Sequence, residues 1–330
     1  MNKMGWRTWG WLLALAACLG GLCIAHQAQV ALAPPAPSPQ PVQVTTQAMV
    51  ETVAPTALSS TPTPTHAATP APAYTATPDG TRMTKPAQPI TLTIVYDNLA
   101  LDARLKTAWG FACLVETGQA IVLFDTGGEG PTLMGNMAVL GIDPRRIDAV
   151  VLSHVHNDHT GGLDALLAVN DLAAVFVPRS FPDEFKTRVS KRAPVIQVRE
   201  PMTITDHIRM TGELGSAIVE QSLIVETDRG LIVMTGCAHP GIVEIVRRAK
   251  AYGEVYLVMG GFHLGDKSAR EVDAIIAELK RLGVRQVAPC HCTGDEAIQQ
   301  FRAAFSADFI QAGVGAVLTP FTGYPGTVQR

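Results

Sequence analysis

The sequence has few cysteines. Of the six in 330 residues, only four follow residue 89, namely Cys113, Cys237, Cys290 and Cys292. Four cysteines in a domain of this size do not make the disulfide framework that stabilises small secreted domains. The count leaves room for one bridge and does not identify its partners.

An excess of basic side chains is also absent. The chain has a formal net charge of -3, and residues 90–330 hold 22 basic and 27 acidic side chains. Surfaces that bind nucleic acid carry a basic patch that neutralises the backbone phosphates. The sequence therefore predicts no nucleic-acid partner.

Prolines are scarce in most of the chain, because thirteen of the 23 lie between Pro34 and Pro89. Residues 26–89 are rich in Pro, Ala and Thr, and such a segment cannot bury enough apolar area to offset the entropy lost on ordering. Frequent proline stiffens it toward extended conformations. We predict a disordered linker over 26–89, followed by one catalytic domain over 90–330.

Residues 1–25 have the plan of an export signal. Lys3 and Arg7 precede an uncharged stretch from Trp9 to Ala25, which is a positive region followed by an apolar one. The stretch lies at the lower limit of the roughly 17–25 residues that span a bilayer. Cys18 ends a run that resembles a bacterial lipobox. We expect a lipoprotein signal or a single-span anchor, which would place the domain outside the cytoplasm and attach it to the membrane only there.

Alternating and β-branched segments predict strands, and helical spacing predicts helices. The change from early hairpins to alternating strands and helices indicates mixed sheets covered by helices, an α/β class. The expected strands are 90–95, 111–116, 120–124, 149–153, 173–178, 217–227, 230–235, 254–259 and 284–288, and the expected helices are 131–140, 242–252, 269–282 and 295–305.

Histidines gather where these strands end. Seven histidines follow residue 89, and six lie in loops directly after predicted strands, namely His154, His156, His159, His239, His263 and His291. Only His207 does not. In open α/β sheets, ligands bind outside the carboxyl ends of the strands. The pattern predicts one functional site at that edge.

The run from His154 to His159 points to metal chemistry. It offers His154, His156, Asp158 and His159 within six residues and ends in Thr-Gly-Gly. Imidazole and carboxylate groups are ligands for zinc and other first-row divalent metals. A lone His-x-His pair would be weak evidence, but four donors in one short run after a strand are typical of a metal site.

The run also resembles the His-x-His-x-Asp-His signature of the metallo-β-lactamase superfamily. Within it, the sequence is similar to the group that includes the 7,8-dihydropterin-6-methyl-4-(β-D-ribofuranosyl)aminobenzene-5'-phosphate synthases. The segments that carry this resemblance are Leu123–Gly127, Thr211–Glu213, Gly236–Ile242, Gly260–Leu264 and His291–Gly294. The likeness extends from about residue 91 to the C-terminus and excludes residues 1–89.

The resemblance implies a four-layer αββα sandwich with two divalent metal ions at one edge of its sheets. Zn²⁺ is the expected ion, with Fe or Mn as alternatives. The resemblance implies His154, His156 and a later histidine as ligands of one ion, and Asp158, His159 and a last histidine as ligands of the other. We choose His239 for the later histidine and assign the last to His291. The resemblance also implies that Asp125 holds the second ring nitrogen of a ligand histidine, as supporting groups in metal sites do.

Cys237 marks a departure from the wider superfamily. Many members place a metal-bridging aspartate after a strand, and here Gly236-Cys237 occupies a comparable place. Cys237 is either a thiolate ligand or a buried side chain beside the ligands, and we favour the second. The departure leaves the number and identity of the metal ions open. Glu213 lies either near the metals or in a solvated loop.

His263 has two interpretations, as a metal ligand or as a residue that exchanges protons with the substrate, and we favour the second. Cys290 and Cys292 flank His291 and should point away from it on an extended chain. The aromatic residues Trp109, Phe111 and Phe262 could line a substrate pocket, but we expect all three to pack in the core.

The predicted function is hydrolysis of a small-molecule ester, phosphoester or lactone by a metal-activated water, with Asp158 and His263 handling protons. A pterin-phosphate transferase or synthase is the second hypothesis, although the predicted export argues against a cytoplasmic biosynthetic role. A metal-binding sensor module without turnover is the third. β-Lactamase activity is not favoured, because the loops at His239 and His263 do not match those of β-lactamases.

Overall fold

The computed structural model describes residues 90–319. The signal or anchor predicted over 1–25 and the linker predicted over 26–89 lie outside the described residues, as do residues 320–330 of the predicted domain. Between residues 90 and 319, no helix has both the length and the apolar character that a membrane span needs.

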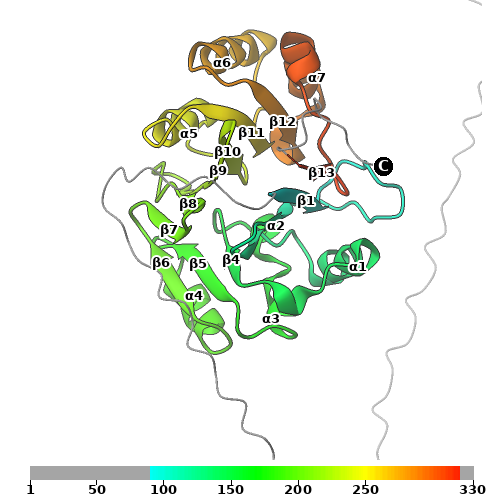
Figure 1. Ribbon diagram of the computed structural model, residues 1–330, viewed down its shortest axis with the longest axis vertical. Helices are drawn as coiled ribbons and strands as arrows, with labels where there is room; N and C mark the ends of the chain where they lie inside the picture. Colours follow the sequence, from blue (N-terminus) through cyan, green and yellow to red (C-terminus); the bar gives the residue numbers. More distant parts are fainter. Residues whose placement is uncertain (1–89, 320–330) are drawn as a thin grey trace, which may run out of the picture. The chain divides into compact units, whose positions relative to one another are not determined.

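The described residues form two β-sheets with helices on their outer faces (Figure 1). The strands are β1 (Thr91–Tyr96), β2 (Ala112–Glu116), β3 (Ile121–Phe124), β4 (Ala149–Val151), β5 (Ala174–Pro178), β6 (Val195–Val198), β7 (Met202–Thr205), β8 (Ile208–Met210), β9 (Leu223–Thr227), β10 (Gly230–Thr235), β11 (Val255–Gly261), β12 (Gln286–Cys290) and β13 (Val317–Leu318). The helices are α1 (Gly130–Leu140), α2 (Asn157–Thr160), α3 (Leu163–Leu167), α4 (Asp183–Ser190), α5 (Ile242–Ala249), α6 (Ala269–Arg281) and α7 (Asp295–Phe305).

Both sheets are mixed. The first has the order β13-β1-β2-β3-β4-β5-β6, and β3 to β6 run parallel to one another. The second has the order β12-β11-β10-β9-β8-β7, and β10 to β12 run parallel. Each sheet therefore has a set of neighbouring strands whose carboxyl ends lie along one edge, and the loops after these strands carry the predicted site.

Alternation along the strands divides the apolar side chains among three cores. In β4, Val151 lies in the core between the sheets, whereas Val150 packs toward the helices α1, α3 and α4. In β11, Met259 lies in the core between the sheets and Val258 packs toward α5, α6 and α7. Figure 1 shows these two helix groups on opposite sides of the strands. The four-layer αββα prediction is confirmed.

Most of the predicted elements are present, with their ends shifted by at most three residues. The strand predicted over 217–227 is wrong in its first half, because β9 begins only at Leu223. The preceding residues form a loop in which buried Glu220 turns toward the other strand ends. The sequence did not predict the helices α2, α3 and α4 or the strands β6, β7, β8 and β13. Strand β7 is only half-buried along its length, which weakens any alternation signal.

The backbone is strained where the strands of the site end. Asp125, Ala238, His263 and His291 have φ values of 58°, 60°, 52° and 50°. Left-handed conformations cost L-residues free energy and persist where the surrounding structure requires them. Four of the five such non-glycine residues between 90 and 319 directly follow β3, β10, β11 or β12 or lie within a few residues of their ends. The strain therefore concentrates at the predicted site.

Candidate metal centre

Three histidines form the first group of potential metal ligands. His154 and His156 follow β4, and His239 follows β10, so the two sheets contribute one segment each. One ring nitrogen from each lies within 4.8 Å of the others. His154 is buried, while His156 and His239 are half-buried. We call this group the all-histidine cluster. Its members are the three residues that the sequence assigned to one ion.

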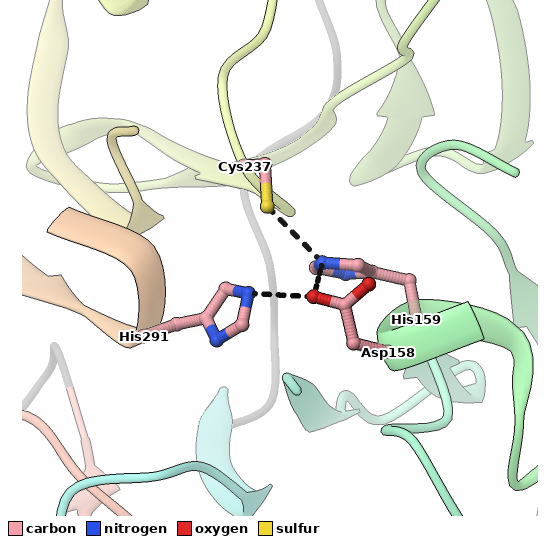
Figure 2. Close-up of side chains that lie close together, drawn as sticks. All are labelled: Asp158, His159, Cys237 and His291. Atoms are coloured by element: carbon pink, nitrogen blue, oxygen red, sulfur yellow. Dashed lines mark hydrogen bonds and ion pairs between the residues drawn. The ribbon is translucent and has the colours of Figure 1, made fainter. Parts of the chain in front are cut away.

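A second group has mixed chemistry. Asp158 and His159 lie on α2, Cys237 follows β10 and His291 follows β12, and their donor atoms all lie within 4.8 Å of one another (Figure 2). Asp158 Oδ2 is 3.5 Å from His159 Nε2 and 3.3 Å from His291 Nε2. Although partial burial opposes it, hydrogen bonds from these two rings hold the pKa of Asp158 well below its usual value. We call this group the mixed cluster.

Asp125 supports the mixed cluster from behind. It is fully buried, and its Oδ2 atom lies 2.7 Å from His159 Nδ1. Burial alone would lower the pKa of His159, but the carboxylate of Asp125 outweighs it and raises that pKa to about 10. The contact leaves Nε2 of His159 facing Cys237 Sγ, 3.2 Å away. A carboxylate that fixes the ring of a metal-binding histidine is a common arrangement.

Ser153 links Asp125 to the all-histidine cluster. Its hydroxyl donates to Asp125 Oδ2 at 2.7 Å and lies 2.9 Å from His154 Nδ1, and its backbone N–H donates to Asp125 Oδ1. Gly236 makes this packing possible, because a Cβ atom there would lie 2.1 Å from Ser153 Oγ. One buried network therefore orients a histidine from each cluster.

Asn98 holds His291 in the mixed cluster. Its Oδ1 atom lies 3.0 Å from His291 Nδ1, and its Nδ2 donates to the backbone carbonyl of His291 at 3.2 Å. The Nε2 atom of His291 is then left to face Asp158. Sequence reasoning missed Asn98. It follows β1, about two hundred residues from its partner, and no local spacing marks it.

Glu220 fixes the loop that supplies Cys237 and His239. Its carboxylate is buried and accepts hydrogen bonds from the Thr235 hydroxyl and from the backbone N–H groups of residues 236 to 239, at 2.9 to 3.0 Å. These bonds satisfy a buried charge that would otherwise be costly. Glu220 was also missed, because the sequence assigned it to the interior of a strand.

His263 and Cys292 lie beside the two clusters. The donor atoms of Cys237, His239 and His263 form a third group within 4.8 Å of one another, and His263 is exposed. Contact with Cys292 raises the pKa of His263. The extended chain expected around His291 is wrong at Cys292, because a 3₁₀ turn runs from His291 to Thr293 and brings the Cys292 thiol against Cys237. Cys290 does point away, into the core between the sheets.

The aromatic residues near the site have different environments. Phe111 and Phe262 are buried in the core, as expected. Trp109 is 59% exposed, so its predicted core position is wrong. Its ring lies over His291 with 4.8 Å between the centroids. Glu213 is half-buried and accepts a hydrogen bond from the Ser180 N–H, which gives it a role in fixing a loop.

The clusters have the chemistry that divalent transition metals require. Imidazole, carboxylate and thiolate groups are the ligands of zinc and of its first-row neighbours. His239 Nε2 is buried without a hydrogen-bond partner, whereas buried polar atoms are nearly always satisfied. His291 Nε2 is buried as well, and its polar contact is with Asp158 Oδ2, itself a potential ligand, at 3.3 Å. These two ring nitrogens, one in each cluster, are atoms that bound metal ions would satisfy. The residues therefore fit divalent transition-metal ions.

The comparisons with known proteins agree with this architecture. Residues 110–245 match the family model described as the metallo-beta-lactamase superfamily. The chain is 29% identical over 278 residues to the 7,8-dihydropterin-6-methyl-4-(beta-D-ribofuranosyl)-aminobenzene-5'-phosphate synthase of Methanocaldococcus jannaschii, covering 68% of this chain and 95% of that protein.

Two solved structures are similar in fold. Tm1679, a metal-dependent hydrolase of the β-lactamase superfamily, matches with a TM-score of 0.60 and 27% identity, covering 69% of this chain and 98% of that one. The metallo-beta-lactamase fold protein YhfI of Bacillus subtilis matches with a TM-score of 0.53 and 15% identity, covering 70% and 99%. The second likeness concerns the fold alone.

Proposed function

Because this chain belongs to the metallo-β-lactamase superfamily, we propose that it is a metal-dependent hydrolase of a small-molecule ester, phosphoester or lactone. The observation that carries the proposal is the juxtaposition of the all-histidine and mixed clusters at one sheet edge. The proposed ligands are His154, His156 and His239 for one ion and Asp158, His159 and His291 for the other. Zn²⁺ is the expected ion.

The metal pair, when bound, would supply Lewis acidity and a water that is ionised near neutral pH. The chain's own residues transfer the protons and orient the ligands. Asp158 carries a negative charge at neutral pH, because His159 and His291 hold its pKa low, and it can accept a proton from the attacking water. His263 is exposed beside Cys237 and His239, so it can donate a proton to the leaving group. The Asp125 network keeps the ligand rings oriented during turnover.

Metal content and turnover test this proposal together. The full chain, loaded with Zn²⁺, is expected to bind two ions per molecule and to hydrolyse a member of a panel of lactones, carboxylic esters and phosphodiesters. His263→Ala is expected to retain both ions and to lose turnover by about 10²–10⁴-fold. If His263→Ala loses an ion, the residue is a ligand in the active form, and its proposed role as proton donor is wrong.

A synthase that joins a pterin-like phosphate to an aromatic acceptor is the second candidate. It rests on the 29% identity to the archaeal synthase, which extends over 95% of that protein. A product screen with a pterin diphosphate and an aminobenzene acceptor separates the two functions. Formation of a coupled product without net ester hydrolysis would favour the synthase.

We further infer from the sequence of residues 1–89 that the domain works outside the cytoplasm. Lys3 and Arg7 before an apolar stretch, and Cys18 at a lipobox-like position, support a membrane-attached N-terminus. Fractionation of cells that express the full chain and its Cys18→Ala variant tests this. Recovery of the full chain with the cytoplasmic fraction would contradict it.

A further inference from the structure

Four side chains at this sheet edge form a further set of potential metal ligands. Neither of the two proposed ions is bound by all four of them. The four side chains are Cys237, His239, His263 and Cys292. The first three have donor atoms within 4.8 Å of one another. The rings of His239 and His263 lie 4.5 Å apart between centroids.

Cys292 lies beside these three residues, in the 3₁₀ turn that follows β12. Its thiol contacts the thiol of Cys237 and the ring of His263, and its Sγ lies 3.8 Å from the Cys237 carbonyl oxygen. Gly261 leaves room for the sulfur, because a Cβ atom there would lie 2.7 Å from it. All four cysteines between residues 90 and 319 are free thiols, so neither sulfur is committed to a disulfide.

Two thiols and two imidazoles make a complete tetrahedral ligand set for zinc. Soft thiolate ligands also favour thiophilic ions over harder ones. Three of the four members have a support: Glu220 holds the Cys237–His239 loop, and the turn after β12 holds Cys292. His239 Nε2 is buried without a hydrogen-bond partner, which leaves it free to bind an ion.

We propose that Cys237, His239, His263 and Cys292 bind a single thiophilic divalent ion in a closed Cys₂His₂ site. This site excludes the two-ion state, because Cys237 belongs to the mixed cluster and His239 to the all-histidine cluster. Four protein ligands leave no position for a water molecule, so the one-ion form is hydrolytically inactive. His263 is then a ligand in the one-ion form and a proton donor in the two-ion form.

Cobalt substitution tests the proposal without any measurement of turnover. The full chain is prepared with Cys18 and Cys23 both replaced by serine, so that N-terminal thiols contribute nothing, and Co²⁺ is added to the metal-free protein. One equivalent is expected to give thiolate-to-cobalt charge-transfer absorption from two sulfurs. A second equivalent is expected to remove most of this absorption, because the ligands proposed for the two-ion form include no sulfur.

Variants identify the sulfurs. Cys292→Ser and Cys237→Ser are each expected to lose about half of the one-equivalent absorption. Cys290→Ala is the matched control, because its thiol lies two residues away in the core between the sheets, and it should leave the absorption unchanged. Full absorption in Cys292→Ser, or absorption that keeps rising with the second equivalent, would overturn the proposal.

X-ray absorption at the zinc edge gives a measurement that needs no replacement of a proposed ligand. With one equivalent of Zn²⁺ in the same serine background, we expect two sulfur neighbours at about 2.3 Å and two nitrogen neighbours at about 2.0–2.1 Å. A first shell with one sulfur or none would contradict the proposal even if the cysteine variants fail to fold. Because neither readout involves a substrate, failure here leaves the proposed hydrolase activity untouched.

Discussion

The mixed cluster and the all-histidine cluster lie side by side but differ in charge and burial. In the mixed cluster, the side chains of His159 and His291 are fully buried and that of Asp158 is 20% exposed. It also contains a carboxylate and a thiol. The all-histidine cluster offers three imidazoles and no anionic group, and two of its members, His156 and His239, are only half-buried.

The rings of the mixed cluster also have more supporting contacts than those of the all-histidine cluster. Asp125 and Asn98 fix the rings of the two mixed-cluster histidines. In the all-histidine cluster, Ser153 contacts one ring, and Nδ1 of His156 lies 3.1 Å from Nε2 of its neighbour His154. An anionic ligand and oriented rings both favour a dication. We therefore expect an ion in the mixed cluster to bind more tightly than one in the all-histidine cluster.

Replacement of Asp158 should have the largest effect on the difference in metal affinity between the two clusters. Asp158→Asn removes the anionic ligand of the mixed cluster, and we expect the affinity for that ion to fall by more than the roughly 10–100-fold that loss of a supporting hydrogen bond costs. Calorimetric titration of Zn²⁺ into the metal-free protein with Cys292 replaced by serine, which cannot form the one-ion Cys₂His₂ site, measures the loss. His156→Ala is the paired variant and should weaken only the other ion. If Asp158→Asn leaves the tighter of the two binding steps unchanged, the assignment of tight binding to the mixed cluster is wrong.

Loss of the Glu220 carboxylate should weaken both clusters together. Glu220→Gln places an amide donor against N–H groups that now donate to the carboxylate, and we expect the free energy of unfolding to fall by about 2–4 kcal/mol. Chemical unfolding measures this, and metal titration should show both ions weakened, because the loop supplies one residue to each cluster.

Glu213→Gln is the matched control for that experiment. Glu213 lies in the same segment but accepts one hydrogen bond, from the Ser180 N–H, at the protein surface. We expect its replacement to cost less than about 1 kcal/mol. Equal losses of unfolding free energy in the two glutamate variants would show that the hydrogen bonds around Glu220 contribute no more to stability than the single bond of Glu213.

The clusters illustrate which parts of a site can be predicted from a sequence. The run His154–His159 was visible because its donors are close in sequence and follow a strand. Asn98 and Glu220 were not, because their partners lie 193 and 15 to 19 residues away and are chosen by tertiary packing. The error at Cys292 has a local cause: an extended chain was assumed where a 3₁₀ turn follows β12. Local spacing thus predicts ligands better than it predicts their supports.

Asp97 should make the protein around the mixed cluster sensitive to pH. It is fully buried beside Cys290, and burial raises its pKa from 3.8 to about 6. The native state then holds the proton more tightly than the unfolded state, so Asp97 lowers the free energy of unfolding as the pH rises from about 4 to about 6. Asp97→Asn does not titrate. The stability difference between the metal-free wild type and Asp97→Asn should change by about 2–3 kcal/mol across this interval.

Urea unfolding at several pH values measures that difference. Relative to the wild type, the asparagine variant should gain stability from about pH 4 upward and reach a plateau above about pH 6. A difference that stays constant with pH would mean that Asp97 titrates alike in the folded and unfolded chains. In that case burial next to the mixed cluster does not perturb it.

Asn98 should have the smallest effect, and one confined to the mixed cluster. Asn98→Ala frees the ring of His291 to rotate, and we expect the affinity of the mixed-cluster ion to fall by about tenfold, the lower end of the range for such supports. Asn98→Asp keeps an oxygen acceptor for His291 Nδ1 and should restore most of the affinity, which a purely structural role would not predict. Competition with a chromophoric chelator can resolve a change of this size. If Asn98→Ala weakens both ions equally, the support extends to the whole site, and the two clusters are less independent than their separate contacts indicate.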